Sequence, residues 1–412
     1  MMNKFVNRTN LFQKHIWANW AFPIFYLVLL VFMVIEPGID TLCQQMGVDY
    51  RGYYASGEIV RNHGFGAVYD QALQKKYQED LLYSCPTLAD GKPLFVAMPY
   101  LPIFVILFIP FTYLPFTTSF FLWTALHFGL FFFALYNFSK ILVGKTNSYR
   151  IFQWGVGLPF ITNLYLGQIN ALLVFLLCRC MIFFWQGKHR ISGGWLSILL
   201  LKPHILILIL PGLIISQNWS MILGFSLGTV FILGSSFLLA GWDGLTAMGK
   251  LTYQFAGPLI QNPAGMMNWR ALGLNLAKVI PNWLGWVLAA ALAAIITWVV
   301  LHQWWKSQFI ARNLRIGLVP ITLIGTFIVS WHSHFYMQML LVPFLLILDT
   351  KRKLPQKYRL AWLLGPPLFF ITVHFSLPAL QNRIFGLFML SLNIFMFWGL
   401  TQIGFGRYQI NG

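Results

Sequence analysis

Long apolar stretches recur along the chain from Trp17 to Leu400, separated by short polar or basic segments. A membrane-spanning helix needs about 20 consecutive apolar residues. The stretches are unbroken, whereas a transmembrane β-barrel shows segments of about ten residues in which apolar and polar positions alternate. The pattern therefore predicts an all-α polytopic membrane protein, with 1–412 forming a single membrane domain of about 12 membrane helices.

Some of these helices are expected to be short or discontinuous. The stretch "ISGGWLSILLLKPHILILILPGLII" is either one span with Lys202 buried at its centre, or two short helices that meet at "KPH". We favour two helices that bring Lys202 and His204 near the outer face, because Pro203 breaks a helix and a lone buried Lys is costly. The segment Ile151–Leu166 is also short for a full span, and the side on which Lys140–Arg150 lies stays open.

The most polar stretch follows the first apolar run, Trp17–Ile35. With the N-terminus inside, residues 36–99 form the first extracytoplasmic loop. Within it, "YRGYYASGEIV" and "DQALQKKYQEDLLY" carry apolar residues at helical spacing with charges between them, which is typical of amphipathic juxtamembrane helices. A cleaved signal peptide is the alternative, but "VIEPGIDTLC" lacks the small residues of a cleavage site.

Composition and charge narrow the class of protein. Apolar residues make up 58% of the chain and charged residues 9%, whereas soluble proteins carry about 25% charged residues. The net charge of +18 is spread over short loops, where basic residues act as topology anchors. No basic patch on a soluble domain is available to bind phosphodiesters. We therefore expect a lipid bilayer and no nucleic acid as partner.

The basic clusters also orient the chain. Lys188 with Arg190, residues 306–315, residues 351–359 and Arg407 mark the inner side, so both termini are expected to be cytoplasmic. This predicts a second extracytoplasmic loop at 241–282 and an outer turn at "WHSH". We expect the protein in the cytoplasmic (inner) membrane, with its active site on the extracytoplasmic side.

Acidic residues crowd that same side: eight of the ten lie between Glu36 and Asp90. Polar groups from distant segments are predicted at the same face, and they are costly in an apolar chain unless they are paired or hydrated. We therefore expect them to share an aqueous cavity with the loop acids. They are Asp49 and Arg51, Gln168 and Asn170 in "GQIN", Lys202 and His204 in "KPH", Arg270 in "NWRALG", and His332 and His334 in "WHSH".

A carboxylate opposite cations indicates a division of labour. A carboxylate can take a proton from an acceptor hydroxyl, while Lys, Arg and His can hold a phosphate and stabilise it as it leaves. That combination describes glycosyl transfer from a lipid-phosphate sugar whose apolar tail lies between helices.

The order of these pieces resembles glycosyltransferase family 87, within the GT-C superfamily of polyprenyl-phosphate-sugar-dependent enzymes. "VDYRGYYASGEIVRNHGFGAVYD" is similar to the family's first outer loop, "GQIN" to its G-Q-x-N, and "GGWLSILLLKPH" to its A-G-x-x-x-G…K-P segment. "SWHSHFYMQMLLVP" resembles a late histidine-containing turn. "PYLPIF" departs from a "YPP" entry, and "NWRALG" lacks the serine of N-x-S-x-R-G. The resemblance covers about Val48 to Pro343.

The resemblance implies a GT-C type fold and an inverting transfer of a sugar, such as mannose or another hexose or pentose, to an extracytoplasmic glycolipid or glycan. It implies that the first-loop acid is the catalytic base, by position Asp49, with Asp40 as the nearest alternative. We expect no cofactor beyond the donor, and metal dependence stays open, although no compact metal-ligand motif occurs. Donor or substrate binding is assigned to Lys202, His204, Arg270, His332, His334, Gln168, Asn170, Arg51, Tyr53 and Tyr54.

Each residue also has a structural interpretation. Asp49 can simply pair with Arg51, Lys202 can snorkel to an interface, Arg270 can anchor the loop to lipid headgroups, and the tyrosines can form an interfacial belt. Two apart on a helix, His332 and His334 would lie on nearly opposite faces. Cys43 and Cys85 either form a disulfide or stay as two thiols.

Two other functions remain open. A transporter or flippase of lipid-linked substrates tends to have polar groups inside its spans, whereas these spans are almost free of acids. A non-catalytic assembly protein of an envelope-polysaccharide system is the other alternative, because a fold can persist without its chemistry.

Overall fold

The computed structural model describes residues 24, 28, 46–82, 95–144, 147–256, 263–307, 317–351, 353–377 and 380–403. These residues form helices and loops without a strand. The α-helices are α3 (Val48–His63), α4 (Gln71–Asp80), α5 (Pro102–Val105), α6 (Phe116–Val143), α7 (Ser148–Gly155), α8 (Leu158–Leu166), α9 (Asn170–Trp185), α10 (His189–Ser197), α11 (Ile209–Ile215), α12 (Trp219–Ala256), α13 (Trp269–Leu276), α14 (Asn282–Ser307), α15 (Leu318–Val329), α16 (Val342–Thr350), α17 (Gln356–Ser376) and α18 (Gln381–Ile403). The short 3-10 helices are η1 (Phe65–Tyr69), η2 (Ile109–Tyr113), η3 (Ile198–Leu201), η4 (Pro203–Leu206), η5 (Pro263–Gly265) and η7 (Phe335–Leu341).

Within the described residues, four helices are long and apolar enough to cross a membrane: α6, α12 over Trp219–Gln254, α14, and α18 over Gln381–Gln402. Five apolar segments are shorter: Pro102–Tyr113, Asn170–Trp185, Pro203–Ile215, Leu318–Val329 and Phe335–Thr350. The predicted all-helical membrane architecture is confirmed, with short as well as full-length apolar helices. The count of about 12 membrane helices stays a prediction.

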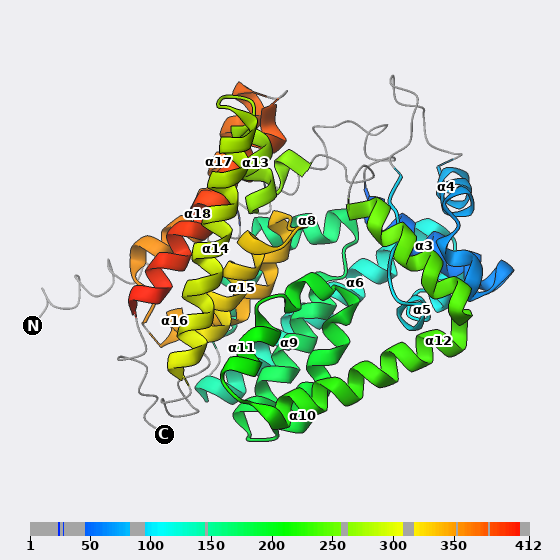
Figure 1. Cartoon of the computed structure of the whole chain (residues 1–412), viewed down its shortest axis with the longest axis horizontal. Coiled ribbons are helices and arrows are strands. Elements are labelled where there is room, and N and C mark those ends of the chain that lie inside the picture. Colours follow the sequence, from blue (N-terminus) through cyan, green and yellow to red (C-terminus); the bar gives the residue numbers. More distant parts are fainter. Residues whose placement is uncertain are drawn as a thin grey trace, which may run out of the picture.

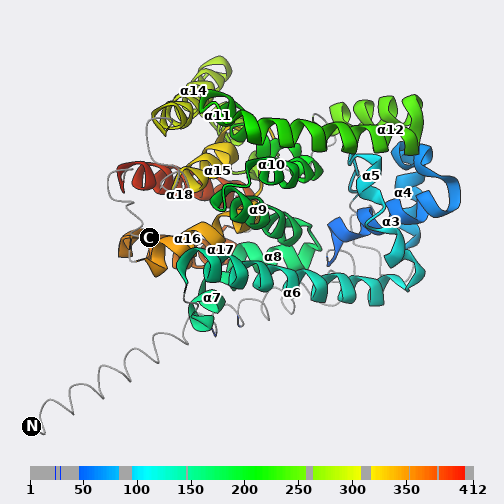
Figure 2. The ribbon, with the colours of Figure 1, turned by 90° about the horizontal axis from the view of Figure 1, so that it is seen from below.

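The first-loop helices lie between the two longest helices. Figure 2 shows α6 and α12 on opposite sides of the molecule, with α3, α4 and α5 between them at one end. In Figure 1, α13 to α18 gather at the other end. α8, α9 and α10 lie between these two groups and connect them.

Two helices occur in the first loop as the spacing predicts, but α3 is not a surface helix. Eleven of its 16 residues are buried, because η1, η2, α4 and α5 pack around it. α4 keeps an exposed charged face, and its two buried glutamines bind the backbone of an extended segment: Gln78 Nε2 donates to the Val96 carbonyl at 2.8 Å, and Gln74 Oε1 accepts from Met98 N at 3.1 Å. This pairing fixes the chain just before Tyr100.

The predicted break at "KPH" is confirmed. Lys202 has φ −134° and ψ 81°, and it separates η3 from η4, so α10 and α11 are distinct helices. α12 continues to Ala256 beyond a kink at Gly241, whose φ of 66° favours glycine. The first part of residues 241–282 is therefore helical, and the position of this segment outside the membrane stays a prediction. The segment after the kink lies against η1 and α4, and Gln71 Nε2 donates to Gln254 Oε1 at 2.7 Å.

Candidate functional site

The segment "GQIN" is a tight turn from α8 into α9. Gly167 ends α8 with a φ of 72°, in the left-handed region that glycine accepts without strain. The turn is closed by bonds to Asn163, whose carbonyl accepts from Gln168 N at 2.9 Å and whose Oδ1 accepts from Asn170 N at 3.2 Å. The turn therefore presents Gln168 and Asn170 from one rigid element.

Lys202 reaches this turn from the break between η3 and η4. Its Nζ donates to Gln168 Oε1 at 2.7 Å and to Asn170 Oδ1 at 3.1 Å. The residue is only 7% exposed, so neutral amide oxygens replace the water that a buried ammonium would lose. Lys202 does not snorkel to an interface.

Asp49 comes to the same turn from the first turn of α3. Gly47, with a φ of 68°, precedes the helix, and its N–H donates to the Tyr165 carbonyl at 2.8 Å. The approach is close: a Cβ on Gly167 would lie 2.5 Å from the Cβ of Tyr50, the residue after Asp49. Two glycines thus allow the start of α3 to dock on "GQIN".

The Asp49 carboxylate is bridged to the cation rather than paired with it. The Gln168 side chain hydrogen-bonds the carboxylate, and Lys202 and Arg51 act on it electrostatically. Asp49 and Lys202, both among the described residues, form no direct ion pair. α3, which carries Asp49, is not among the candidate membrane spans. Burial raises the pKa of Asp49 to about 6, although the hydrogen bond from Gln168 and the charges of Lys202 and Arg51 act to lower it.

Three tyrosines surround this bridge, and two of them were not predicted. Tyr53 donates to Gln168 Oε1 at 3.2 Å, and its hydroxyl lies 3.3 Å from that of Tyr100. Gln168 Nε2 lies 3.4 Å from the Tyr336 hydroxyl, and the Lys202 ammonium lies 5.8 Å from the centre of the Tyr336 ring. Tyr100 stands in "PYLPIF" and Tyr336 directly follows "WHSHF", so both lie within the quoted motifs without a signal that separates them from core aromatics.

The three predicted histidines form one cluster. The ring of His332 lies 6.1 Å from that of His204 and 4.9 Å from that of His334, and His334 stacks on Tyr336 at 5.3 Å. The "WHSH" segment is a non-helical turn between α15 and η7, so the opposite faces expected for a helix do not apply. No group of three or more His, Cys, Asp or Glu in the described part of the chain is arranged to hold a metal ion.

The histidines in this turn are neutral at pH 7. Burial, together with the smaller effect of the nearby charge of Lys202, lowers the pKa of His334 to about 4. A neutral imidazole donates one hydrogen bond and accepts another. In this state the positive charge of the site comes from Lys202 and Arg270.

Arg270 is attached to the same turn through its own loop. Asn268 caps α13 by accepting from Ala271 N at 3.0 Å, and it donates to the Trp331 carbonyl at 3.1 Å. The Arg270 guanidinium lies 4.3 Å from the centre of the Trp331 ring, and its charge acts on His332. Arg270 is 8% exposed, so it is stacked within the protein instead of extending along a loop surface.

Other predicted residues lie outside this cluster. Tyr54 is buried and donates to the Leu114 carbonyl at 2.8 Å, so it packs in the core away from Gln168. Arg51 is 1% exposed, and its charge acts on Asp49 by lowering the pKa of that carboxyl. Tyr53 is buried as well, so Tyr53 and Tyr54 do not form an interfacial belt. Asp40, Cys43 and Cys85 lie outside the described residues.

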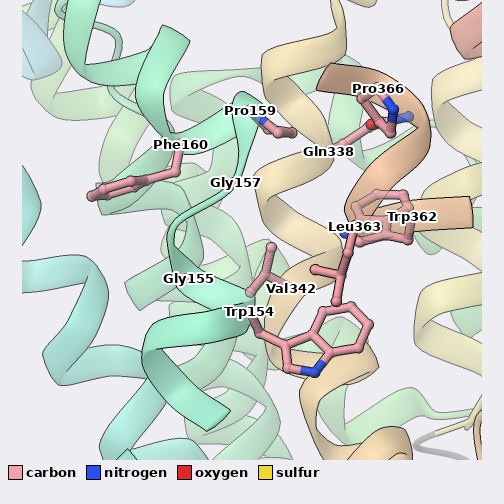
Figure 3. A pocket seen from close by; sticks show the side chains of 10 residues that line it. All are labelled: Trp154, Gly155, Gly157, Pro159, Phe160, Gln338, Val342, Trp362, Leu363 and Pro366. Atoms are coloured by element: carbon pink, nitrogen blue, oxygen red, sulfur yellow. The ribbon is translucent and has the colours of Figure 1, made fainter. Parts of the chain in front are cut away.

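A separate small pocket lies between α7, α8, α16 and α17 (Figure 3). Its lining includes Trp154, Gln338 and Trp362, and none of the predicted site residues. Gln338 is fully buried and donates to Asn393 Oδ1 at 2.8 Å, while Asn393 Nδ2 contacts Met267 Sδ at 3.2 Å. This chain of contacts links η7 to α18 and to the loop that precedes α13 and its Arg270.

Comparison with known proteins gives one match. A sequence model described as glycosyltransferase family 87 matches residues 99–330. The matched region contains "GQIN", Lys202, His204 and Arg270, and it begins after Asp49 and ends before His332. No curated protein and no solved structure matches the chain.

Proposed function

On the premise that this chain belongs to glycosyltransferase family 87, we propose that it moves a sugar from a polyprenyl-phosphate donor to an extracytoplasmic glycolipid or glycan. The family makes the chain a glycosyltransferase, and its apolar helices make it a membrane protein. The lipid donor, the acceptor, the sugar, and the inner-membrane location with an extracytoplasmic site are the proposed part.

The observation that carries the proposal is the position of Gln168 between Asp49 and Lys202. Gln168 Oε1 accepts from the Lys202 ammonium at 2.7 Å, and the same side chain hydrogen-bonds the Asp49 carboxylate. A direct ion pair would use the carboxylate and hold its pKa low. Because Gln168 stands between Asp49 and Lys202, the ionised carboxylate stays able to accept a proton.

Asp49 acts in this proposal as the general base. Its pKa of about 6 leaves it mostly ionised at neutral pH, while making it a stronger base than an exposed Asp. A base works best when its pKa lies near the working pH. Asp49 as a residue is partly exposed, while its carboxylate is desolvated enough for burial to be the main cause of its raised pKa.

We assign the leaving phosphate to the side of Gln168 that carries Lys202. Lys202 and Arg270 supply charge, and His332 and His334 supply hydrogen bonds from neutral rings that can protonate when an anion binds. The acceptor oxygen forms a bond to the anomeric carbon, and its proton passes to Asp49. The bond from that carbon to the phosphate oxygen breaks, and polyprenyl phosphate leaves with the electron pair.

A base and a phosphate site on opposite sides of one side chain favour a single displacement. The acceptor approaches from the Asp49 side and the phosphate leaves on the Lys202 side, which inverts the anomeric centre. Tyr53, Tyr100 and Tyr336 lie along the boundary between the two sides. Their hydroxyls are available to orient the sugar.

The test uses purified full-length protein. It is incubated with a glycolipid acceptor and either a polyprenyl-phosphate mannose or a nucleotide sugar, in detergent and in liposomes. Consumption of the lipid-linked donor, with release of polyprenyl phosphate, is the expected result. Use of the nucleotide sugar alone would contradict the assigned donor, and movement of intact donor across the bilayer without release would favour the transporter alternative.

A further inference from the structure

Arg179 is a cation in the middle of an apolar helix, and the candidate site does not use it. It lies on α9, where the surrounding residues read "FLLCRCMIFF". Asn170 of the site begins this helix, and nine residues, or about 14 Å at helical rise, separate it from Arg179. Ionisable residues inside membrane helices are rare and generally have a partner or a function.

The Arg179 guanidinium lies against aromatic rings instead of a carboxylate. It is 4.9 Å from the centre of the Phe183 ring and 5.5 Å from that of Trp195 on α10. Phe175 lies at 6.1 Å from Trp195 on the same face. In the part of the chain that the structure describes, Arg179 makes no hydrogen bond to a protein acceptor and no ion pair. Arg179 is partly exposed, so its N–H donors are available to a ligand beside this aromatic surface.

This surface is on the lipid-facing side of the helix bundle. Phe133 of α6 is 56% exposed and its ring lies 6.3 Å from Phe175. Ile191 of α10, four residues before Trp195, is 49% exposed. Arg179 itself is partly exposed. Large apolar side chains exposed beside a cation are suited to an acyl chain below a charged headgroup.

The depth of Arg179 fits a headgroup near one interface. It lies six residues before the end of α9, and Trp195 lies six residues after the start of α10, so both are about 9 Å from the turn that joins the helices. The turn carries two further exposed cations, Lys188 and Arg190. A long side chain can snorkel over such a distance toward phosphate groups. This end of α9 is opposite the end that carries Asn170.

The supporting helices are held in place by close packing. A Cβ on Gly193 of α10 would lie 2.0 Å from the Met221 carbonyl oxygen, and one on Gly224 of α12 would lie 2.0 Å from the Arg190 carbonyl oxygen. Small residues at such crossings let membrane helices approach closely. Trp195 is thus presented by a fixed helix pair, and Figure 2 shows α10 beside α9.

We propose that Arg179, with Lys188 and Arg190, binds the phosphate of an anionic phospholipid in the leaflet opposite the candidate site, with one acyl chain along Phe175 and Phe133. The inference requires only that the chain spans a bilayer, and it does not depend on the proposed transfer reaction. The guanidinium offers paired donors to phosphate oxygens, and the aromatic rings hold it in place.

The test compares lipids on the purified full chain. Wild type and Arg179→Gln are transferred into nanodiscs of phosphatidylcholine, with and without phosphatidylglycerol, and retained lipid is counted by native mass spectrometry. We expect wild type to retain phosphatidylglycerol selectively and Arg179→Gln to bind it about fivefold more weakly, the effect of one basic residue at an anionic surface. Lys250→Gln, which removes an exposed cation from α12, should bind as wild type does.

Three outcomes would overturn the proposal. They are equal retention by wild type and Arg179→Gln, no preference for phosphatidylglycerol over phosphatidylcholine, and displacement of the lipid by millimolar inorganic phosphate. If Arg179→Gln does not fold, the double variant Lys188→Gln/Arg190→Gln replaces it. That variant leaves the aromatic surface intact, and it should also lose selectivity for phosphatidylglycerol.

Discussion

Replacing Asp49 by Asn should remove catalysis and at the same time stabilise the protein at neutral pH. Burial raises the pKa of Asp49 from 3.8 to about 6 in the folded chain. The folded state therefore favours the protonated carboxyl, and its ionisation opposes folding. A shift of this size corresponds to about 3 kcal/mol at pH 7 and above. Asn has the shape of the protonated form without this cost.

The sign of the pH dependence follows from the raised pKa. Well below pH 3.8 both folded and unfolded Asp49 are protonated, and the variant has no advantage. As the pH rises toward 6, the unfolded chain releases its proton while the folded chain keeps it, so wild type loses stability. Above pH 6 the difference is constant at about 3 kcal/mol.

The assay is thermal unfolding of wild type and Asp49→Asn in one detergent at pH 7.5, 6 and 4.5, beside transfer activity. The variant should unfold at a higher temperature at pH 7.5, with a gap that narrows at pH 4.5. Asp70→Asn is the matched control, because Asp70 is an exposed N-cap of α4 and Asn caps equally well. A wild type more stable than Asp49→Asn at pH 7.5 would refute the reasoning, since ionised Asp49 would then be held by its partners.

Three further results are expected. Lys202→Met should lower kcat/KM about 100- to 1000-fold through loss of phosphate stabilisation. Because Lys202 lowers the pKa of Asp49, the variant should also shift the acidic limb of the pH–rate profile above pH 6. An unshifted limb would contradict electrostatic coupling between Lys202 and Asp49. Gly167→Ala should lower the free energy of unfolding by about 2–4 kcal/mol, because residue 167 has a φ of 72° and an added Cβ would meet Tyr50. If the variant melts at the wild-type temperature, the "GQIN" turn does not require glycine at this position. Arg270→Lys should raise KM for the donor more than it lowers kcat, because Lys keeps the charge but loses the planar stack on Trp331; an unchanged KM would remove Arg270 from the donor site.

Much of the fold follows from elementary patterns in the sequence. The break at Lys202 is predictable because a proline follows a cation within an apolar run, and the structure confirms it. The two first-loop helices are predictable from their spacing. The burial of α3 is not, because its charges suggest an exposed face, whereas Arg51 is 1% exposed. Only the three-dimensional packing of η2, α5 and α6 around α3 determines this.

The candidate site, too, could be predicted from the sequence only in part. Polar side chains are energetically costly to bury in an apolar chain, so the sequence indicates that Gln168, Lys202 and the histidines need partners. The structure brings these residues together. The sequence cannot show that Gln168 is the bridge, because one side chain meets Lys202 and Asp49 only after α3, α9 and η3 are packed. The sequence does not single out Tyr336, because aromatic residues are common in the packed core of a membrane helix bundle.

The central claim is that Asp49 accepts the proton of the sugar acceptor. Its most direct test is the rate of sugar release from a polyprenyl-phosphate donor by wild type and by folded Asp49→Asn, measured from pH 5 to pH 8 in the presence of acceptor. The account predicts a wild-type rate that falls below pH about 6 and no transfer by the variant at any pH. Equal rates for the two proteins would contradict it.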